Sequence, residues 1–407
     1  TISNTPSSGD TTAPAITGTT VASNNASIAV TFSEAVYNTS GGSGALEASD
    51  FTLTLSGGTA TLASATPSSI SSSSNTYTLG LSLSGTPNGS ETITVVPSSS
   101  TAIYDAAGNA ASTSQSNNTV TLNDKTAPTL SSVGIASNNS TTTLAKASNV
   151  VTLTFTASET IATPVVTFQS GSAAITASVT HVNTSGNIWT AAYTANASDT
   201  TGSVTYSIAF SDSAGNAGTA VTSGTGSVTF DKTVPTLSSV GIASNNSTTT
   251  LAKASNVVTL TFTASETIAT PVVTFQSGSA AITASVTHVN TSGNIWTAAY
   301  TANASDTTGS VTYSIAFSDS AGNAGTAVTS GGGSVTFDKT APTITSFTST
   351  TNNGSYNSAD TVNITATASE AVVAGNTITA TLDTGDTVLL TAAANGTTLV
   401  GTYTVGA

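Results

Sequence analysis

NVVTLTFT at residues 149–156 and SVTYSIAF at 203–210 decide the fold class, because apolar side chains occupy every second position in both. In the first stretch Val151, Leu153 and Phe155 share one face, and the threonines between them share the other. Successive side chains of a strand point to opposite faces of a sheet, so this period of two predicts β-structure. Threonine suits the outward face, since its branched Cβ favours extended backbone while its hydroxyl stays in water.

Further runs of the same kind surround these two. NIWTAAYT at 187–194 alternates in the same way, and polar turn clusters such as SNNS, TSGN and DSAGN separate the runs. No helical periodicity is present, and the runs amount to about seven short strands in roughly 100 residues. The pattern predicts a Greek-key β-sandwich.

An internal repeat sets the domain organisation. Residues 130–231 recur as 237–338, with Thr225 replaced by Gly332 as the one difference. The joints read DKTAPT at 124–129, DKTVPT at 231–236 and DKTAPT at 338–343, and a looser GDTTAP lies at 9–14. We therefore expect a linker at 1–12 and four domains, at 13–124, 125–231, 232–338 and 339–407. They are called domains 1 to 4 below.

Domain 4 is expected to be an incomplete sandwich. It has candidates for the first five strands, A to E, and the sequence stops at GTYTVGA, where the other domains continue into two more. Either the chain is cut there, or the missing strands come from a neighbouring molecule.

Composition excludes several classes of function. Five lysines, no arginine and 19 carboxylates give a net charge of −14, which excludes binding to nucleic acid or to an anionic membrane surface. No apolar run is long enough to span a bilayer. The absence of cysteine removes disulfides and thiolate chemistry, and the absence of methionine predicts a processed part of a longer precursor.

The joint D-K-T-A-P, the T-A-S-E strand end, the S-D-S-A-G-N loop and the G-S-V-T-F-D exit together resemble a known family. They resemble the bacterial immunoglobulin-like (Big-type) tandem repeats of large cell-surface proteins, adhesins and S-layer-like proteins. TFSEAVYN and AIYDAAGNAAS in domain 1 resemble related modules. The resemblance implies an all-β tandem array of immunoglobulin-like Greek-key sandwiches outside the cell, often stiffened by calcium. It implies no single activity.

The carboxylates recur in register. Each domain has an Asp at its entrance and a Glu after strand B, and the first three have an Asp that opens a D-x-A-G-N loop. In an immunoglobulin-type sandwich these three positions meet at the N-terminal pole. For domain 1 they are Asp10, Glu34 and Asp105. The E–F loop lies at the opposite pole, facing the next domain, and carries a further acid.

This topology predicts one carboxylate group at each joint. The first joint would hold Glu91, Asp124, Glu159 and Asp212, the second Asp199, Asp231, Glu266 and Asp319, and the third Asp306, Asp338 and Glu370.

Such groups repel themselves unless a cation binds. One lysine per joint cannot neutralise them, and oxygen-only ligands suit Ca²⁺, so calcium at the joints is the expected cofactor. The alternative is turn chemistry: the Asp residues cap their own turns, and each Glu pairs with a neighbouring lysine. No continuous EF-hand loop exists, so the sites would be discontinuous.

Other candidate residues give weaker evidence of a functional site than the carboxylates do. His181 and His288 are one repeated position without acidic neighbours in sequence, which favours satisfied surface histidines. Trp189 and Trp296 alternate in phase with tyrosines and are expected in the core. No nucleophile–base set recurs, so no enzyme activity is predicted.

The sequence favours a non-enzymatic extracellular structural protein: a rod of repeats that serves as a surface-layer or filament subunit or an adhesin stalk, stiffened by calcium. Self-association into a lattice or filament is expected, because the smooth Thr/Ser/Ala faces carry almost no lysine to blunt strand edges. The alternative is a ligand- or carbohydrate-binding adhesive module, with a glycan or a cell-surface partner.

Overall fold

The computed structural model describes residues 9–406. Residues 1–8 of the expected linker lie outside the described residues. The regular structure is all β apart from one short 3-10 helix, η1 (Ala48–Asp50), and no helix in the described range is long and apolar enough to cross a membrane. The chain divides into two compact units. The first unit ends at Thr233, and the second begins at Val234.

Domain 1 lies in the first unit and has two main sheets. One has the order β1-β2-β6-β5, the second has the order β3-β8-β9, and β4 pairs with β7. The strands are β1 (Ile16–Val21), β2 (Ser27–Phe32), β3 (Phe51–Ser56), β4 (Thr61–Leu62), β5 (Ile70–Ser73), β6 (Thr76–Gly80), β7 (Leu83–Ser84), β8 (Thr92–Pro97) and β9 (Thr119–Thr121).

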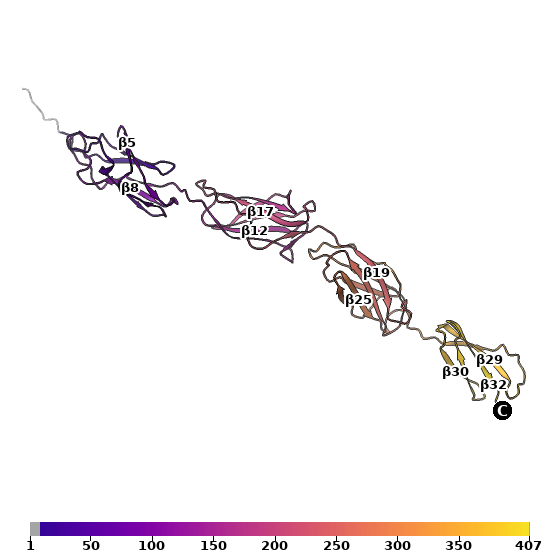
Figure 1. Cartoon of the computed structure of the whole chain (residues 1–407). Helices are drawn as coiled ribbons and strands as arrows, with labels where there is room; N and C mark the ends of the chain where they lie inside the picture. The colour runs from indigo at the N-terminus through magenta and orange to yellow at the C-terminus, as the bar shows by residue number, and fades with distance from the viewer. Residues whose placement is uncertain (1–8, 407) are drawn as a thin grey trace, which may run out of the picture. The chain divides into compact units, whose positions relative to one another are not determined.

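Domain 2, also in the first unit, is a complete sandwich. One sheet has the order β10-β12-β16-β15, and the other has the order β11-β18-β17-β13-β14, with β11 and β18 parallel. The strands are β10 (Leu130–Ser137), β11 (Leu144–Ala145), β12 (Val150–Ala157), β13 (Val165–Ser170), β14 (Ala173–Ala174), β15 (Thr180–Ser185), β16 (Ile188–Thr194), β17 (Gly202–Ala209) and β18 (Thr229–Phe230). Figure 1 labels β12 and β17, one from each sheet.

The predicted alternation builds the core of domain 2. Phe155 on β12 lies opposite Trp189 on β16, and both side chains are buried. Tyr206 and Ile208 on β17 cover them from the other sheet. Burial of each such large apolar side chain contributes about 2 kcal/mol, which is why the period of two suffices to select this fold.

Domain 3, in the second unit, repeats this arrangement. Its sheets have the orders β19-β21-β25-β24 and β20-β27-β26-β22-β23. The strands are β19 (Leu237–Ser244), β20 (Leu251–Ala252), β21 (Val257–Ala264), β22 (Val272–Ser277), β23 (Ala280–Ala281), β24 (Thr287–Ser292), β25 (Ile295–Thr301), β26 (Gly309–Ala316) and β27 (Thr336–Phe337).

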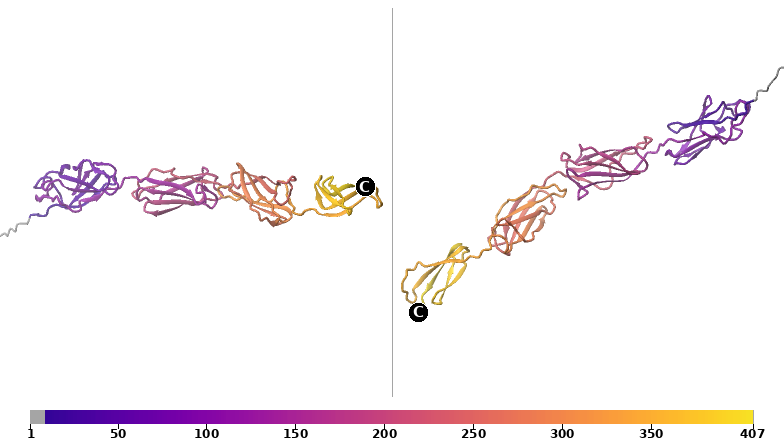
Figure 2. Two further views of the ribbon diagram at one scale, coloured as in Figure 1. Left: turned by 90° about the horizontal axis from the view of Figure 1, so that it is seen from below. Right: turned by 180° about the vertical axis from the view of Figure 1, so that it is seen from behind.

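Domain 4, also in the second unit, is a single five-stranded sheet in the described range, with the order β28-β29-β32-β31-β30. Both views of Figure 2 show this part, in yellow, without a second sheet against it. The strands are β28 (Ile344–Thr348), β29 (Thr361–Val372), β30 (Thr377–Thr381), β31 (Thr387–Thr391) and β32 (Gly396–Thr404).

The predicted fold class is confirmed: the chain is an all-β tandem array of immunoglobulin-like domains. Its first sheet in domain 2 pairs the strands in the order A-B-E-D, and the second in the order A′-G-F-C-C′. The E–F and F–G loops lie at the two ends of strand F, so this topology places the acidic loops at opposite poles of the domain.

Candidate metal centre

Three carboxylates meet at the entrance of domain 2. Asp124 follows β9, Glu159 follows β12 and Asp212 follows β17, and one oxygen of each lies within 4.8 Å of the others. These segments are far apart in the sequence. They meet because the chain enters the sandwich at the same pole to which strands B and F run.

Asp212 is held by its own loop. One carboxylate oxygen accepts a hydrogen bond from the backbone N–H of Asn216 at 2.8 Å, and the other accepts from the Asn216 side-chain amide at 2.7 Å. Gly215 adopts a φ of +91°, which glycine tolerates at no steric cost. Burial acts to raise the pKa of Asp212, but these hydrogen bonds and the amides of Gly215 and Ala214 outweigh it and lower that pKa. Asp212 therefore stays ionised.

The entrance aspartates share a turn. Asp124 accepts the backbone N–H of Thr126 at 2.8 Å, and Asp10, Asp231 and Asp338 each accept the N–H two residues on in the same way. Turn chemistry, the alternative to a metal site, is thus present at these positions. It uses one oxygen of Asp124 and leaves the carboxylate next to Glu159 and Asp212.

Burial and the close approach of the three carboxylates raise the pKa of Glu159. Burial raises its pKa, and the negative charges of Asp124 and Asp212 raise it further. The group thus combines a carboxylate held ionised by its loop with a glutamate that its neighbours push toward protonation. A bound cation would relieve this repulsion.

Domain 1 has a group that the predicted joint sets omit. Asp10, Glu34 and Asp105 come within the same 4.8 Å of one another, and the pKa of Glu34 is raised by burial and by the two aspartates. The register of acids in the sequence already contained these three positions.

In the second unit, the residues of domain 3 that correspond to Glu159 and Asp212 are Glu266 and Asp319. Glu266 follows β21 and Asp319 follows β26 in domain 3, and Asp319 accepts from the backbone N–H of Asn323 at 2.8 Å. In domain 4 Asp338 and Glu370 form no group of three within residues 9–406. One carboxylate oxygen of Glu370 is nevertheless buried without a hydrogen-bond partner in this described range.

The E–F loop acids do not join these groups. Glu91 is fully buried, and its carboxylate accepts from the backbone amides of Thr59 at 2.8 Å and Ala60 at 3.0 Å. Asp199 and Asp306 are buried and accept the amide of the residue three positions earlier, Asn196 and Asn303.

The E–F loop itself still lies at the predicted pole. The Nζ of Lys232 donates to the carbonyl of Asp199 at 2.8 Å, and Lys339 donates to that of Asp306 at 2.9 Å. The loops are therefore at the joints, but their carboxylates turn inward. A buried carboxylate needs hydrogen-bond donors, and the loop's own backbone amides supply them at once.

The remaining candidates are the tryptophans and the histidines. Contrary to the expectation of a satisfied histidine, the Nε2 of His288 is buried without a hydrogen-bond partner within residues 9–406. Trp189 and Trp296 are core residues, as expected. His181 is half-buried, and its Nε2 accepts from the backbone N–H of Val166 at 3.4 Å. The indole nitrogens of both tryptophans have no hydrogen-bond partner within residues 9–406.

Oxygen donors alone make up the groups, which is the chemistry that hard cations select. Three carboxylates from three separate segments leave room for water and carbonyl oxygens to complete a shell of six to eight ligands. The acidic clusters are thus able to hold a divalent cation, and their donor set fits Ca²⁺.

Comparisons with known proteins identify no family. No family model and no curated protein matches the chain. Among solved structures, the I-band fragment I67–I69 of titin is 13% identical, covering 81% of this chain and all of that one, with a TM-score of 0.33. The tandem Ig repeats of Dlar are 12% identical, covering 53% of this chain and 99% of that one, with a TM-score of 0.17. A complex of Dpr2 with DIP-Theta is 10% identical, covering 80% and 98%, with a TM-score of 0.26.

The class follows from the strand order and its repetition: this is a protein of tandem immunoglobulin-like domains with acidic groups at domain entrances.

Proposed function

We propose that the chain is a non-enzymatic extracellular structural protein, in which the domains act as a spacer and calcium stiffens their joints. It would serve as a surface-layer or filament subunit or as the stalk of an adhesin, as the resemblance to Big-type repeats suggests. The observation that carries the proposal is the acidic group that recurs with the repeat, built each time from the entrance Asp, the Glu after strand B and the Asp after strand F.

The glutamates favour calcium binding over turn chemistry alone. The aspartates cap turns, whereas the pKa values of Glu34 and Glu159 are raised by burial and, further, by the charges of the neighbouring aspartates. Within residues 9–406, one carboxylate oxygen of Glu370 is buried without a hydrogen-bond partner, which adds to this support. The joint Asp belongs to the linker and the other two acids belong to the domain that follows. A cation would therefore tie the linker of Asp124 to the body of domain 2.

The duplication supports a spacer. Domains 2 and 3 differ at two positions in over 100 residues, Ala127 against Val234 and Thr225 against Gly332. They are therefore interchangeable, and their number sets a length rather than a chemistry. No nucleophile–base pair recurs in them, which supports a non-enzymatic role.

The alternative of a carbohydrate-binding module has less support. A sugar platform needs exposed aromatic side chains, and both tryptophans are buried. Within residues 9–406, the exposed aromatics are Phe347 and Tyr356, both in domain 4.

Self-association is supported by the strand edges. β15 and β24 are outer strands of their sheets and share the sequence THVNTS, without lysine or proline. Such an edge is open to pairing with another chain. A chain that sediments as a monomer at high concentration, with and without calcium, would argue against a lattice or filament.

Calorimetric titration of the whole chain with calcium tests the metal proposal, with a matched titration with magnesium. We expect calcium binding that weakens when Glu159→Gln removes one ligand, while Asp383→Asn, an exposed acid outside the groups, leaves it unchanged. Absence of calcium binding, or equal loss in both variants, would refute the joint sites. A glycan-array signal would favour the adhesive module.

A further inference from the structure

Domains 2 and 3 are near-identical, so a difference between their structures can be traced to its residue. Of the two differing positions, Ala127 and Val234 are exposed and lie in the joints, ahead of the first strand of each domain. Thr225 and Gly332 lie inside the domains, in the segment that leads into the last strand, β18 or β27. The second position is therefore the one placed to change the interior of a domain.

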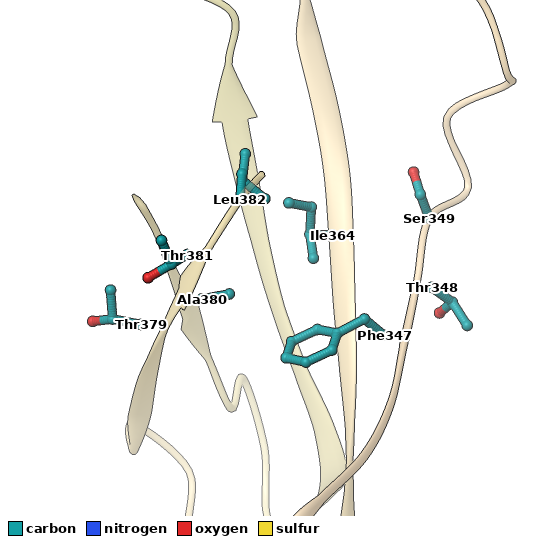
Figure 3. Close-up of a pocket in the computed structure, with 8 residues that line it drawn as sticks. All are labelled: Phe347, Thr348, Ser349, Ile364, Thr379, Ala380, Thr381 and Leu382. Atoms are coloured by element: carbon teal, nitrogen blue, oxygen red, sulfur yellow. The ribbon is translucent and has the colours of Figure 1, made fainter. Parts of the chain in front are cut away.

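Domain 4 offers no third copy for this comparison. Its described part is a single sheet, so no segment there joins two sheets. Figure 3 shows Phe347 and Ile364 on that sheet pointing toward the strand that carries Ala380 and Leu382, around a pocket of about 540 Å³. Only domains 2 and 3 can therefore be compared position by position.

The differing residue joins the two sheets of its domain. After β17 the chain of domain 2 crosses to the other sheet, where Thr225 pairs in parallel with Gly134 of β10, and it then returns as β18. The backbone N–H of Thr225 donates to the carbonyl of Val133 at 2.8 Å, and its carbonyl accepts from the N–H of Ile135 at 3.0 Å. This contact of Thr225 with β10, and that of Gly332 with β19, is called the sheet bridge below.

Domain 3 keeps only the backbone part of the sheet bridge. Gly332 donates to the carbonyl of Val240 at 2.7 Å and accepts from Ile242 at 3.0 Å, so the strands run as they do in domain 2. In domain 2 the hydroxyl of Thr225 donates a further hydrogen bond to the Val133 carbonyl at 3.2 Å, which glycine cannot make. Val133 is buried, whereas its counterpart Val240 is only partly buried.

The backbone of domain 3 does not require glycine at this position. Gly333 has a φ of +78°, but Gly332 does not have a positive φ. A Cβ on Gly332 would meet nothing closer than the carbonyl oxygen of Val240 at 3.6 Å, which is an ordinary contact. Glycine therefore relieves no strain here. Because it loses more conformational freedom on folding than any other residue, it weakens the sheet bridge.

The sheet bridge carries a pull along the chain. The chain enters domain 3 through β19 and leaves it through β27, directly after Gly332. β27 is also parallel to β20, with hydrogen bonds from Thr336 to the carbonyl of Thr250 and from Asp338 to that of Ala252. In a parallel pair, the start of one strand and the end of the other lie at opposite ends. A pull therefore slides the strands along each other and loads these hydrogen bonds together.

We propose that domain 3 is the weak repeat of the array, which opens before domain 2 when the chain is pulled or heated, because Gly332 leaves its sheet bridge less well held. One repeat of the proposed spacer then lengthens under load while the other stays folded. This use rests on the spacer role proposed above, whereas the order of opening does not.

Pulling on one domain at a time in the whole chain tests the order. The chain has no cysteine, so a pair of introduced cysteines gives unique attachment points for the handles of an optical trap. Thr126→Cys with Thr233→Cys loads domain 2, and Thr233→Cys with Thr340→Cys loads domain 3 at the equivalent positions of the joints. Chelator is present throughout, so the result does not depend on calcium at the joints.

We expect domain 3 to unfold at a lower force than domain 2. Exchange of the two residues separates their effect from that of the neighbouring domains: Thr225→Gly should give domain 2 the lower force, and Gly332→Thr should give domain 3 the higher one. In thermal unfolding, followed by the one tryptophan left after Trp296→Phe or Trp189→Phe, each exchange should shift the melting temperature of its own domain by about 4 °C. That shift corresponds to about a fivefold change in the unfolding equilibrium constant.

The other differing position supplies the matched controls. Ala127→Val and Val234→Ala should leave the unfolding forces and melting temperatures of both domains unchanged. Equal forces for the two parent domains, or a Gly332→Thr domain that is no stronger than its parent, would overturn the proposal. Since calcium is absent from these measurements, they can fail while the metal sites are upheld, and the converse also holds.

Discussion

Replacing Glu159 by Gln should have opposite effects on domain 2 with and without calcium. The carboxylate oxygens of Glu159, Asp124 and Asp212 lie within 4.8 Å of one another. At the dielectric of water, each close pair of charges costs about 1 kcal/mol. Glu159 takes part in two pairs, and physiological salt screens such exposed charges, so Glu159→Gln should raise the free energy of unfolding by about 1 kcal/mol in chelator.

The assay needs a signal from domain 2 alone. The chain has two tryptophans, so Trp296→Phe leaves Trp189 as the reporter of domain 2. Thermal unfolding followed by its fluorescence should show a gain of about 4 °C for Glu159→Gln in chelator. With calcium at about 100 times its dissociation constant, the parent should instead gain about 2.7 kcal/mol, and the variant should gain less. Asp383→Asn controls for the change in net charge.

The pH dependence has a definite sign. A carboxyl whose pKa is raised in the folded state binds its proton more tightly there than in the unfolded chain. In chelator, Glu159 therefore destabilises domain 2 increasingly as the pH rises above 4.5, the ordinary pKa, and contributes nothing well below it. Two results together would refute this account of the acidic group. The melting temperature of the parent would not change with calcium, and the variant would be no more stable than the parent in chelator at pH 7.

Three further predictions concern stability. Glu91→Gln should destabilise domain 1 by about 1–3 kcal/mol in urea unfolding. An amide oxygen can replace Oε1, which accepts from Thr59 and Ala60, but the amide NH2 in place of Oε2 cannot accept the N–H of Asn88. Burial acts to raise the pKa of Glu91, yet hydrogen bonds from Ala60, Thr59 and Asn88 lower it. The stabilisation of domain 1 by Glu91 is therefore present above pH 4.5 and fades as the pH falls through the lowered pKa. The variant should lose that pH dependence. Phe155→Ala should cost about 3–5 kcal/mol by the same measurement, whereas truncating the 63% exposed Val165 to Ala should change little, and similar losses would discredit the assigned core face. Gly226→Ala should lower the melting temperature of domain 2, since φ is +76° and a Cβ would lie 2.4 Å from the carbonyl oxygen of Ile135; an unchanged temperature would contradict the close approach.

The sequence by itself was enough for the fold class and for part of the site. Alternation such as Val151, Leu153 and Phe155 specifies a strand with one buried face, because the side-chain period of a strand is two whatever its surroundings. The repeat gave the acids their register. Once strands B and F are known to run to the pole where the chain enters, Glu159 and Asp212 must meet the entrance Asp124.

Tertiary structure alone decided which way the loop carboxylates face. Glu91 and Asp199 occur at the predicted loops, but their carboxylate oxygens accept hydrogen bonds from the backbone amides of Thr59, Ala60 and Asn196. Sequence spacing does not reveal which donors will surround a side chain after folding, and a buried carboxylate goes to the nearest ones.

Domain 4 shows the same limit on a larger scale. The alternation in β30 and β31 predicts two strands but not their partners, because pairing depends on which neighbours are present. With β31 beside it and no F-like strand in the described chain, β30 joins the same sheet, and Phe347 is left exposed on the core face. Local periodicity thus fixes the strands, while long-range pairing decides the sheet they build.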